Sequence, residues 1–176
     1  MRIRPYIESR DYEKLEKWID GERTHALWCA NLVPYPMTRN SFHHYLENNA
    51  KDFADGAYVA TERDEDAIGF FCYSVNDEEN TGFLKFIIVD TDKRGIGCGK
   101  EMLQLALRYA FDITGVALVQ LNVFDENFAA KRCYEKLGFV EDHIIKNVFP
   151  YKDELWSRCR MIIPKQQFLL HQLRHP

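Results

Sequence analysis

The sequence lacks the features that define several large classes of protein. No apolar run approaches the ~20 residues that a membrane-spanning helix needs. The 176-residue chain has a formal net charge of −4, whereas proteins that bind nucleic acids or membrane surfaces usually carry a basic face. The first residues, Met1 to Pro5, contain no apolar segment of the secretory kind. We therefore expect a cytoplasmic protein that binds neither nucleic acid nor a membrane.

The cysteines are too scattered for a metal site or a disulfide framework. Five are present, an odd number, and no two form a Cys-x-x-Cys pair. Paired spacing is what zinc sites and small disulfide-linked folds usually show. We expect free thiols in a reducing compartment and no bound metal. The five positions are Cys29, Cys72, Cys98, Cys133 and Cys159.

The chain does have enough apolar residues to form a core. Apolar residues make up 46% of it and aromatic residues 14%, a composition typical of globular rather than disordered proteins. There is no internal repeat, low-complexity stretch or linker-like segment. The length suits one ordinary domain, so we expect a single domain over residues 1–176.

The spacing of apolar residues predicts a mixed α/β sheet. Three strands joined by tight turns form an antiparallel meander, and the last of them is continuous and therefore central. A strand–helix–strand crossover follows, which should be right-handed with parallel strands. The expected strands are 1–4, 57–61, 68–75, 83–89, 116–124, 139–148 and 155–163. Helices are expected from about residue 9, after the N-cap Thr38, at 99–113 and at 127–137; residues 62–66 form a charged turn, 20–37 are ambiguous, and the tail 165–176 is either a short helix or frayed.

A glycine-rich turn joins the central strand to the next helix. It reads RGIGCGK over residues 94–100. Alternating glycines remove side chains from one side, so that backbone N–H groups can converge on an anion. The helix that starts here adds the positive end of its dipole, and Arg94 and Lys100 add charge. The pattern predicts a phosphate-binding loop.

The two common nucleotide-binding motifs do not fit this loop. A Walker A loop needs Ser or Thr after its lysine, and here Glu101 follows Lys100, while Arg94 stands where the first glycine belongs. A dinucleotide-binding loop needs Gly-x-Gly-x-x-Gly, and here Gly99 comes one position too early. Both nucleotide interpretations therefore fail on spacing.

The loop resembles the Arg/Gln-x-x-Gly-x-Gly/Ala motif of GNAT N-acetyltransferases, with Arg94, Gly97 and Gly99 in the defining positions. The resemblance implies the GNAT fold, a mixed, mostly antiparallel sheet with flanking helices and a cleft between two splayed parallel strands. It also implies that the loop holds the pyrophosphate of acetyl-CoA, and that the preceding strand pairs its backbone with the pantetheine arm. The residues implied for the pantetheine are Ile87, Ile88 and Val89, and those for the pyrophosphate are Arg94, Gly95, Ile96, Gly97, Cys98, Gly99 and Lys100.

A second block extends the resemblance. It places Asn127, Ala130 and Tyr134 on roughly one face of a helix that stops at Gly138. In the family, the asparagine contacts the cofactor and the tyrosine is the usual general acid near the CoA sulfur. Taken singly, Asn127 is also a plain N-cap and Tyr134 a packed core aromatic. One departure from the family pattern is Thr91, where many members have proline.

The resemblance implies an acetyl-CoA-dependent N-acetyltransferase. It would transfer the acetyl group to a primary amine, on a small molecule or a peptide, by direct attack in a ternary complex. The loop and second block look most similar to the ribosomal-protein N-terminal and spermidine acetyltransferase branches. The alternative is a non-catalytic sensor or scaffold that binds acyl-CoA. A homodimer is possible, and the sequence names neither the acceptor nor the oligomeric state.

The general base and the acceptor site stay open. Asp77, Glu78 and Glu79 precede the central strand and form either a base with a water relay or a solvated turn. The oxyanion needs a donor, for which we expect a backbone N–H near Ile88. The remaining candidates are a histidine pair that is either on the surface or in contact with the acceptor, and three aromatic residues that either wall the acceptor site or fill the core. These are His43, His44, Trp28, Tyr35 and Phe42.

Overall fold

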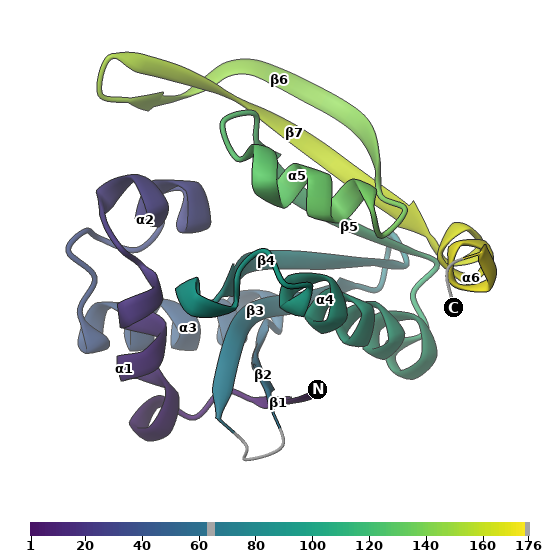
Figure 1. Cartoon of the computed structure of the whole chain (residues 1–176), viewed down its shortest axis with the longest axis horizontal. Helices are drawn as coiled ribbons and strands as arrows, with labels where there is room; N and C mark the ends of the chain where they lie inside the picture. The colour runs from purple at the N-terminus through teal and green to yellow at the C-terminus, as the bar shows by residue number, and fades with distance from the viewer. Residues whose placement is uncertain (63–65, 175–176) are drawn as a thin grey trace.

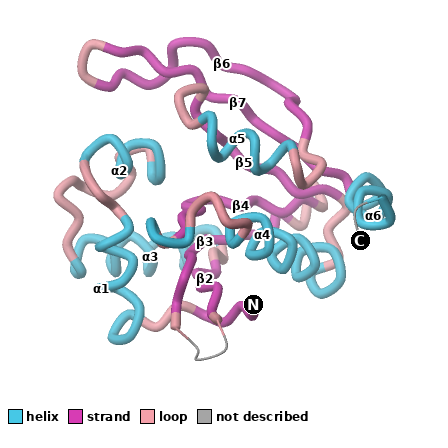
Figure 2. The backbone as a smooth tube through the Cα atoms, viewed as in Figure 1, coloured by secondary structure: helices cyan, strands magenta, loops and turns pink. Residues whose placement is uncertain are grey.

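The computed structural model describes residues 1–62 and 66–174, whose strands form one mixed sheet with helices on both faces (Figures 1 and 2). The strands are β1 (Arg2–Pro5), β2 (Gly56–Thr61), β3 (Ala67–Asn76), β4 (Thr81–Val89), β5 (Leu118–Phe124), β6 (Val140–Tyr151) and β7 (Glu154–Pro164). The helices are α1 (Glu8–Trp18), α2 (Glu22–Cys29), α3 (Arg39–Phe53), α4 (Cys98–Arg108), α5 (Phe128–Glu135) and α6 (Lys165–Arg174). The strand order is β1-β2-β3-β4-β5-β7-β6. The predicted α/β class, the β2–β4 meander and the central place of β4 are confirmed.

Helices differ from the sequence-based expectation in three places. The ambiguous segment 20–37 contains α2. The helix expected at 99–113 starts at Cys98, and its last turn, Tyr109–Thr114, widens into a π-helix that ends at the left-handed Gly115. The tail forms α6, because Phe168 is buried against Phe111 with ring centroids 5.3 Å apart. The expected turn at 62–66 includes residues 63–65, which lie outside the described residues.

Parallel pairing between β4 and β5 is short. The two strands pair only from Thr81 to Leu84 on β4 and from Leu118 to Leu121 on β5. Beyond that point β4 continues to Val89 and β5 to Phe124 without pairing with each other, while the other edge of β5 pairs with β7 along its whole length. The strands therefore splay at their C-terminal ends, as the resemblance implied, and the sheet opens between them.

A β-bulge in β4 changes which side chains face which side of the sheet. The register with β3 slips between Phe70 and Cys72, and Phe86 opposite them has a left-handed φ of 54°. Lys85 and Phe86 consequently point to the same face. The extra residue sends Ile87, after the bulge, to the face that Leu84 occupies before it.

Two cores cover the two faces of the sheet. Helices α4, α5 and α6 cover one face, where Leu84, Leu107 and Leu121 are almost completely buried. Helices α1, α2 and α3 cover the other face over β2–β4, with Phe42 and Phe70 at its centre. Thr38 caps α3 as predicted, because its hydroxyl accepts from the backbone N–H of Ser41. No helix within the described ranges is long and apolar enough to cross a membrane.

Candidate active site

A cavity of about 310 Å³ opens where β4 and β5 separate. The end of β4, the loop and first turns of α4, and one face of α5 line it, and α2 closes it from the side. Many of the residues implied for the cofactor meet here, together with Tyr134. The predicted residues lining the cavity are Ile87, Ile88, Val89, Arg94, Gly95, Gly99, Asn127 and Tyr134; Thr24, Leu27, Trp28, Leu103, Ala129, Ala130 and Cys133 complete it.

Four of the predicted cofactor residues do not line this cavity. Ile96 is 70% exposed, whereas Cys98, the first residue of α4, packs partly buried against the core; Gly97 and Lys100 are likewise absent from the lining. Gly97 is the N-cap of α4, so the backbone N–H groups of the first helical turn face this part of the loop. A role for these four residues in holding pyrophosphate stays a prediction.

The loop glycines are required by the backbone itself. Gly95 has a φ of 80° and Gly97 a φ of 98°, values that residues with a Cβ rarely adopt. A Cβ at either position would meet no atom within 4 Å. Replacing Gly97 with valine would therefore strain the folded loop even without a ligand. Gly99 is different, because its φ is ordinary and its Cβ would lie 3.5 Å from Val89.

Arg94 braces the loop as well as lining the cavity. Its Nε donates to the carbonyl oxygen of Val89 at 3.1 Å, and its Nη2 donates to the carbonyl oxygen of Trp18 at 2.9 Å. The guanidinium thus joins the end of β4 to the C-terminus of α1, where a cation is favoured by the helix dipole. Its charge remains beside the loop that would bind phosphate.

Asn127 acts as the N-cap of α5 and also reaches the cavity. Its Oδ1 accepts from the backbone N–H of Ala130 at 3.3 Å. Its role as an N-cap is therefore compatible with the cofactor contact that the resemblance implies, since the capped end of α5 is also the edge of the cavity.

Tyr134 is one of the residues that line the cavity. It is buried, and its ring packs edge-on against Phe139 with centroids 6.0 Å apart. Burial, with a smaller contribution from Cys133, raises the pKa of the Tyr134 phenol above its usual value of 10.0. Among the described residues, none forms a hydrogen bond with its hydroxyl. Tyr134 is thus held protonated at neutral pH with its proton uncommitted.

Trp28 separates the cofactor cavity from a second cavity of about 280 Å³. Its indole Nε1–H donates to the carbonyl oxygen of Phe86, the bulged residue of β4, at 2.8 Å. The sequence suggested Trp28 as a wall residue, but no sequence signal predicted this bond. Phe42 is completely buried in the core and Tyr35 is half-exposed beside His25, so neither lines a cavity found here.

Helix α2 bridges the two separated parts of the sheet. On one side, Trp28 contacts β4. On the other, Arg23 pairs with Glu154 at 2.6 Å and with Glu126 at 3.0 Å, and its guanidinium lies 5.0 Å from the Trp156 ring. These residues lie next to Thr24 and Leu27, which sequence reasoning did not identify as site residues.

The acidic run lies at the wrong end of β4 to act as a base. The backbone N–H groups of Glu78 and Glu79 donate to Asn76 Oδ1 in the turn before the strand. Ile87 lies six positions after Thr81, which corresponds to about 20 Å of strand. Asp77 belongs to the same exposed turn, so the solvated-turn interpretation fits the structure.

The histidine pair of α3 also lies outside the cavities. His43 is exposed and contacts Glu8 at 2.9 Å and Glu47 at 3.4 Å, while His44 contacts Asn48 at 3.1 Å. No carboxylate lines any of the cavities described in residues 1–62 and 66–174.

Comparisons with known proteins agree with this geometry. Residues 12–139 match the model of the acetyltransferase (GNAT) family. An uncharacterized prophage-derived N-acetyltransferase of Bacillus subtilis, YokL, is 25% identical over 138 residues, 78% of this chain and 77% of that protein. The Escherichia coli peptidyl-lysine N-acetyltransferase YjaB is 26% identical over 68% of this chain and 76% of its own.

The same architecture occurs in a solved structure. A crystal structure of spermidine N-acetyltransferase from Vibrio cholerae, in complex with CoA and spermine, superposes with a TM-score of 0.81 over 96% of this chain and 97% of that one, at 21% identity. At this identity the likeness shows the fold. Together with the family match over most of the chain, it establishes that the protein belongs to the GNAT family and is an acetyl-CoA-dependent N-acetyltransferase.

Proposed function

We propose that the chain acetylates a primary amine by direct attack in a ternary complex, with Tyr134 as the general acid. The observation that carries the proposal is the uncommitted Tyr134 hydroxyl in the cavity between the splayed strands. Acetyl-CoA would lie along Ile87–Val89 with its pyrophosphate at residues 94–100. Asn127 would contact the cofactor from the other side. Residues 1–176 act in this proposal as one catalytic domain.

The reaction proceeds in two steps. The neutral amine nitrogen attacks the thioester carbon, and the carbonyl oxygen takes the electron pair. A backbone N–H of β4 near Ile88 stabilises this oxyanion; parallel pairing with β5 stops at Leu84, which leaves the facing edge of β4 open to the substrate. The C–S bond then breaks, the departing thiolate takes the proton of Tyr134, and the nitrogen, which became cationic on attack, releases a proton to solvent to leave the neutral amide. No enzyme nucleophile is needed, so the cysteines have no catalytic part.

The amine proton leaves through solvent. Lysine-like amines have a pKa of about 10.4, so deprotonation must precede attack. No carboxylate lines the cavities in the described part of the chain, and Glu78 and Glu79 lie at the far end of β4. A water relay is therefore the base in this proposal. It also returns a proton to the Tyr134 phenolate after each turnover.

The amine acceptor enters from the Trp28 side. Two of the proteins named above are a peptidyl-lysine and a spermidine N-acetyltransferase, and both acceptors present a primary amine. We propose a small-molecule amine for this chain, since the second cavity, of about 280 Å³, has the volume of a small ligand site.

Turnover of a mixed amine panel tests the function. Purified protein with acetyl-CoA and amines should release free CoA thiol and yield an acetylated product detectable by mass spectrometry, well above the rate without amine. A non-catalytic acyl-CoA sensor would bind acetyl-CoA in calorimetry but release no thiol above the amine-free control with any member of the panel.

Location and assembly complete the proposal. A cytoplasmic location suits the five free cysteines, of which Cys29, Cys72 and Cys159 are buried. A homodimer is suggested by the edge strand β6, where Ile144 and Val148 are exposed. Light scattering of the purified chain measures the assembly state, and a monomer at all concentrations would refute the dimer.

A further inference from the structure

The second cavity continues into a third along the outer face of the sheet. The third has a volume of about 330 Å³ and shares Phe83, Asn122 and Arg158 with the second, which in turn shares Leu27 and Trp28 with the cofactor cavity. A single path therefore leads from the reacting end of the cofactor cavity, past Trp28, to β7. We call the second and third cavities together the acceptor groove.

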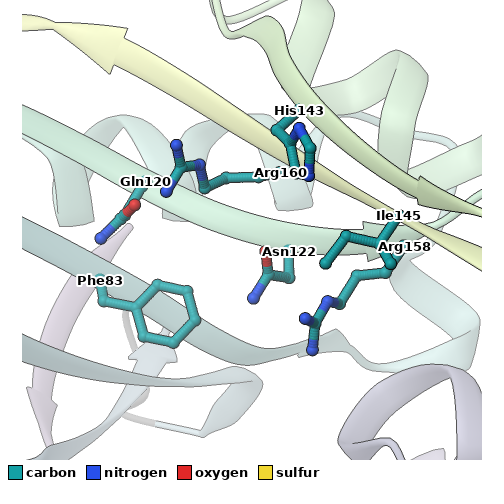
Figure 3. A pocket seen from close by; sticks show the side chains of 7 residues that line it. All are labelled: Phe83, Gln120, Asn122, His143, Ile145, Arg158 and Arg160. Carbon is teal, nitrogen blue, oxygen red and sulfur yellow. The ribbon is translucent and has the colours of Figure 1, made fainter. Parts of the chain in front are cut away.

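Polar side chains of three strands line the outer part of the groove. They share one face of the sheet because they alternate along their strands and lie opposite one another across it. Figure 3 shows Gln120, Asn122 and Arg158 extending from their strands toward the side of Phe83. The full lining of this part is Phe83, Gln120, Asn122, His143, Ile145, Arg158 and Arg160.

The charges of the groove leave one arginine without a counter-ion. Lys85 forms an ion pair with the buried Asp55. Arg160 donates from Nε to Asp142 at 2.6 Å. Arg158 is exposed, and in the described part of the chain it has no ion pair or hydrogen bond.

The cross-strand neighbours of Arg158 explain its lack of a partner. They are Phe124 on β5 and Ile145 on β6, and neither can neutralise it. Since no Asp or Glu lines the groove, it carries positive charge in a chain whose net charge is −4.

We propose that Arg158 binds an oxyanion, carboxylate or phosphate, carried by the acceptor whose amine is acetylated. This inference rests on the proposed function. A guanidinium binds both oxyanions through two parallel N–H donors, and the Asn122 amide lies beside it to add a third. The substrate class is thus a small zwitterionic amine, with its amine near Tyr134 and its anion at Arg158.

The same charges disfavour a polyamine. Spermidine and spermine carry several positive charges and bind best where carboxylates face them. In the groove they would meet the cation of Arg158 and no acidic side chain, which costs binding free energy. This chain therefore differs in acceptor class from the spermidine acetyltransferase whose fold it shares.

Matched acceptor pairs test the inference. Each pair has the same amine with or without the anion: an amino acid and its carboxamide, an aminoalkyl phosphate and the corresponding amino alcohol, with spermidine as the polycation. The carboxylate and phosphate pairs separate the two sources of oxyanion. A charge-assisted contact predicts that kcat/KM for at least one anionic member exceeds that of its neutral partner by about 10- to 100-fold.

Variants assign the effect to one side chain. Arg158→Gln should abolish the preference by raising KM for the anionic acceptor, while the neutral partner and the KM for acetyl-CoA change little. Arg158→Lys should restore part of it. Arg108→Gln removes the same charge from α4, where Arg108 contacts Gln172, and should leave the preference intact. Equal use of both members of every pair, or spermidine as the best acceptor, would overturn the inference.

A binding measurement separates this inference from the proposed function. Calorimetry with the CoA-bound protein detects the anionic amines whether or not they react. Binding that is lost in Arg158→Gln, without any thiol release, would reject the catalytic proposal and keep the anion site. If the anionic amines neither bind nor react, the anion site is rejected, even where neutral amines are acetylated.

Discussion

The Trp28 indole donates its N–H to the carbonyl oxygen of Phe86, at 2.8 Å, and so fixes the bulge of β4 beside both cavities. Within β4, Phe86 is the residue with a left-handed φ, so the hydrogen bond from Trp28 holds the strained point of this strand. It also sets the position of Ile87 and Ile88, which the cofactor would contact. Trp28, which lies between the two cavities, thereby also shapes the strand that the proposed cofactor and acceptor would contact.

Replacing Trp28 with phenylalanine should disturb stability and catalysis together. The change leaves the buried Phe86 carbonyl without its donor, at a cost of about 1–3 kcal/mol in the free energy of unfolding. Because the bulge shifts, kcat should also fall. Urea unfolding and steady-state kinetics measure the two effects. Trp18→Phe is the matched control: Trp18 is buried in the same core with no hydrogen bond from its indole in the described structure, so it should cost stability but not kcat.

Replacing Tyr134 with phenylalanine should lower kcat by about 10²- to 10⁴-fold, the usual contribution of a general acid. The KM for acetyl-CoA and the melting temperature should change little, because the hydroxyl forms no hydrogen bond in the described structure. Tyr73→Phe offers the opposite profile, since the Tyr73 hydroxyl lies 2.8 Å from Thr114 Oγ1, away from the cavities. That variant should lose stability and keep its turnover. Normal kcat in Tyr134→Phe would leave water as the acid.

If the rate falls between neutral pH and pH 10, deprotonation of Tyr134 should not be the cause. Burial raises the pKa of this phenol, so the acid stays protonated through the neutral range and loses its proton only above 10. Difference absorbance between the wild type and Tyr134→Phe should show this tyrosinate only above pH 10. Its appearance near pH 8 would contradict the burial seen here.

Alkaline pH should unfold the protein partly through Tyr45. Burial, and lesser effects of Cys72 and Asp55, raise the pKa of Tyr45 to about 12. A phenol with a raised pKa in the folded state stabilises that state fully below its unfolded pKa of 10, and this stabilisation is lost as the pH rises from 10 toward 12. Tyr45→Phe should therefore flatten the fall of the melting temperature between these values. An equally steep fall in the variant would assign it to other groups.

Gly99 offers a test of the cofactor cavity that the strained loop glycines do not. An alanine Cβ there lies 3.5 Å from Val89 and 3.9 Å from Cys133, which is ordinary contact, and alanine favours a helix. Gly99→Ala should keep the melting temperature and weaken acetyl-CoA binding, and Gly99→Val should weaken it further. Gly97→Ala should instead lower the melting temperature because of its φ of 98°. Unchanged affinity in both Gly99 variants would place the cofactor elsewhere.

The loop and helix patterns predicted more of the site than the strand pattern did. Arg94, Gly99, Asn127 and Tyr134 stand at fixed spacing, and the fold brings them to one cavity. The bulge at Phe86 has no signal in the run FLKFIIV, because the residue with the left-handed φ is neither glycine nor asparagine and is held there by tertiary contact.

Long-range contacts also explain what the sequence left open. Segment 20–37 is ambiguous by periodicity, since the face of α2 is buried against strands about 100 residues later in the chain: Ala26 packs with Phe124, Tyr151 and Trp156. The acceptor groove gathers side chains from four strands, so no single stretch of sequence describes it. Only the sheet order places Arg158 beside Asn122.

The short parallel pairing has a mechanical consequence. The pairing between β4 and β5 ends at Leu84 and Leu121, so the two strands diverge from this paired segment, which acts as the pivot between them. Any angular change at the pivot produces a displacement that grows in proportion to distance along the strands, and it is largest near Val89 and Phe124. Helix α2 joins the strands close to these ends, where a clamp has the greatest leverage. A change in the contacts of α2, through Trp28 on one side and Arg23 on the other, should therefore alter the separation of the strand ends more than a change near the paired segment would.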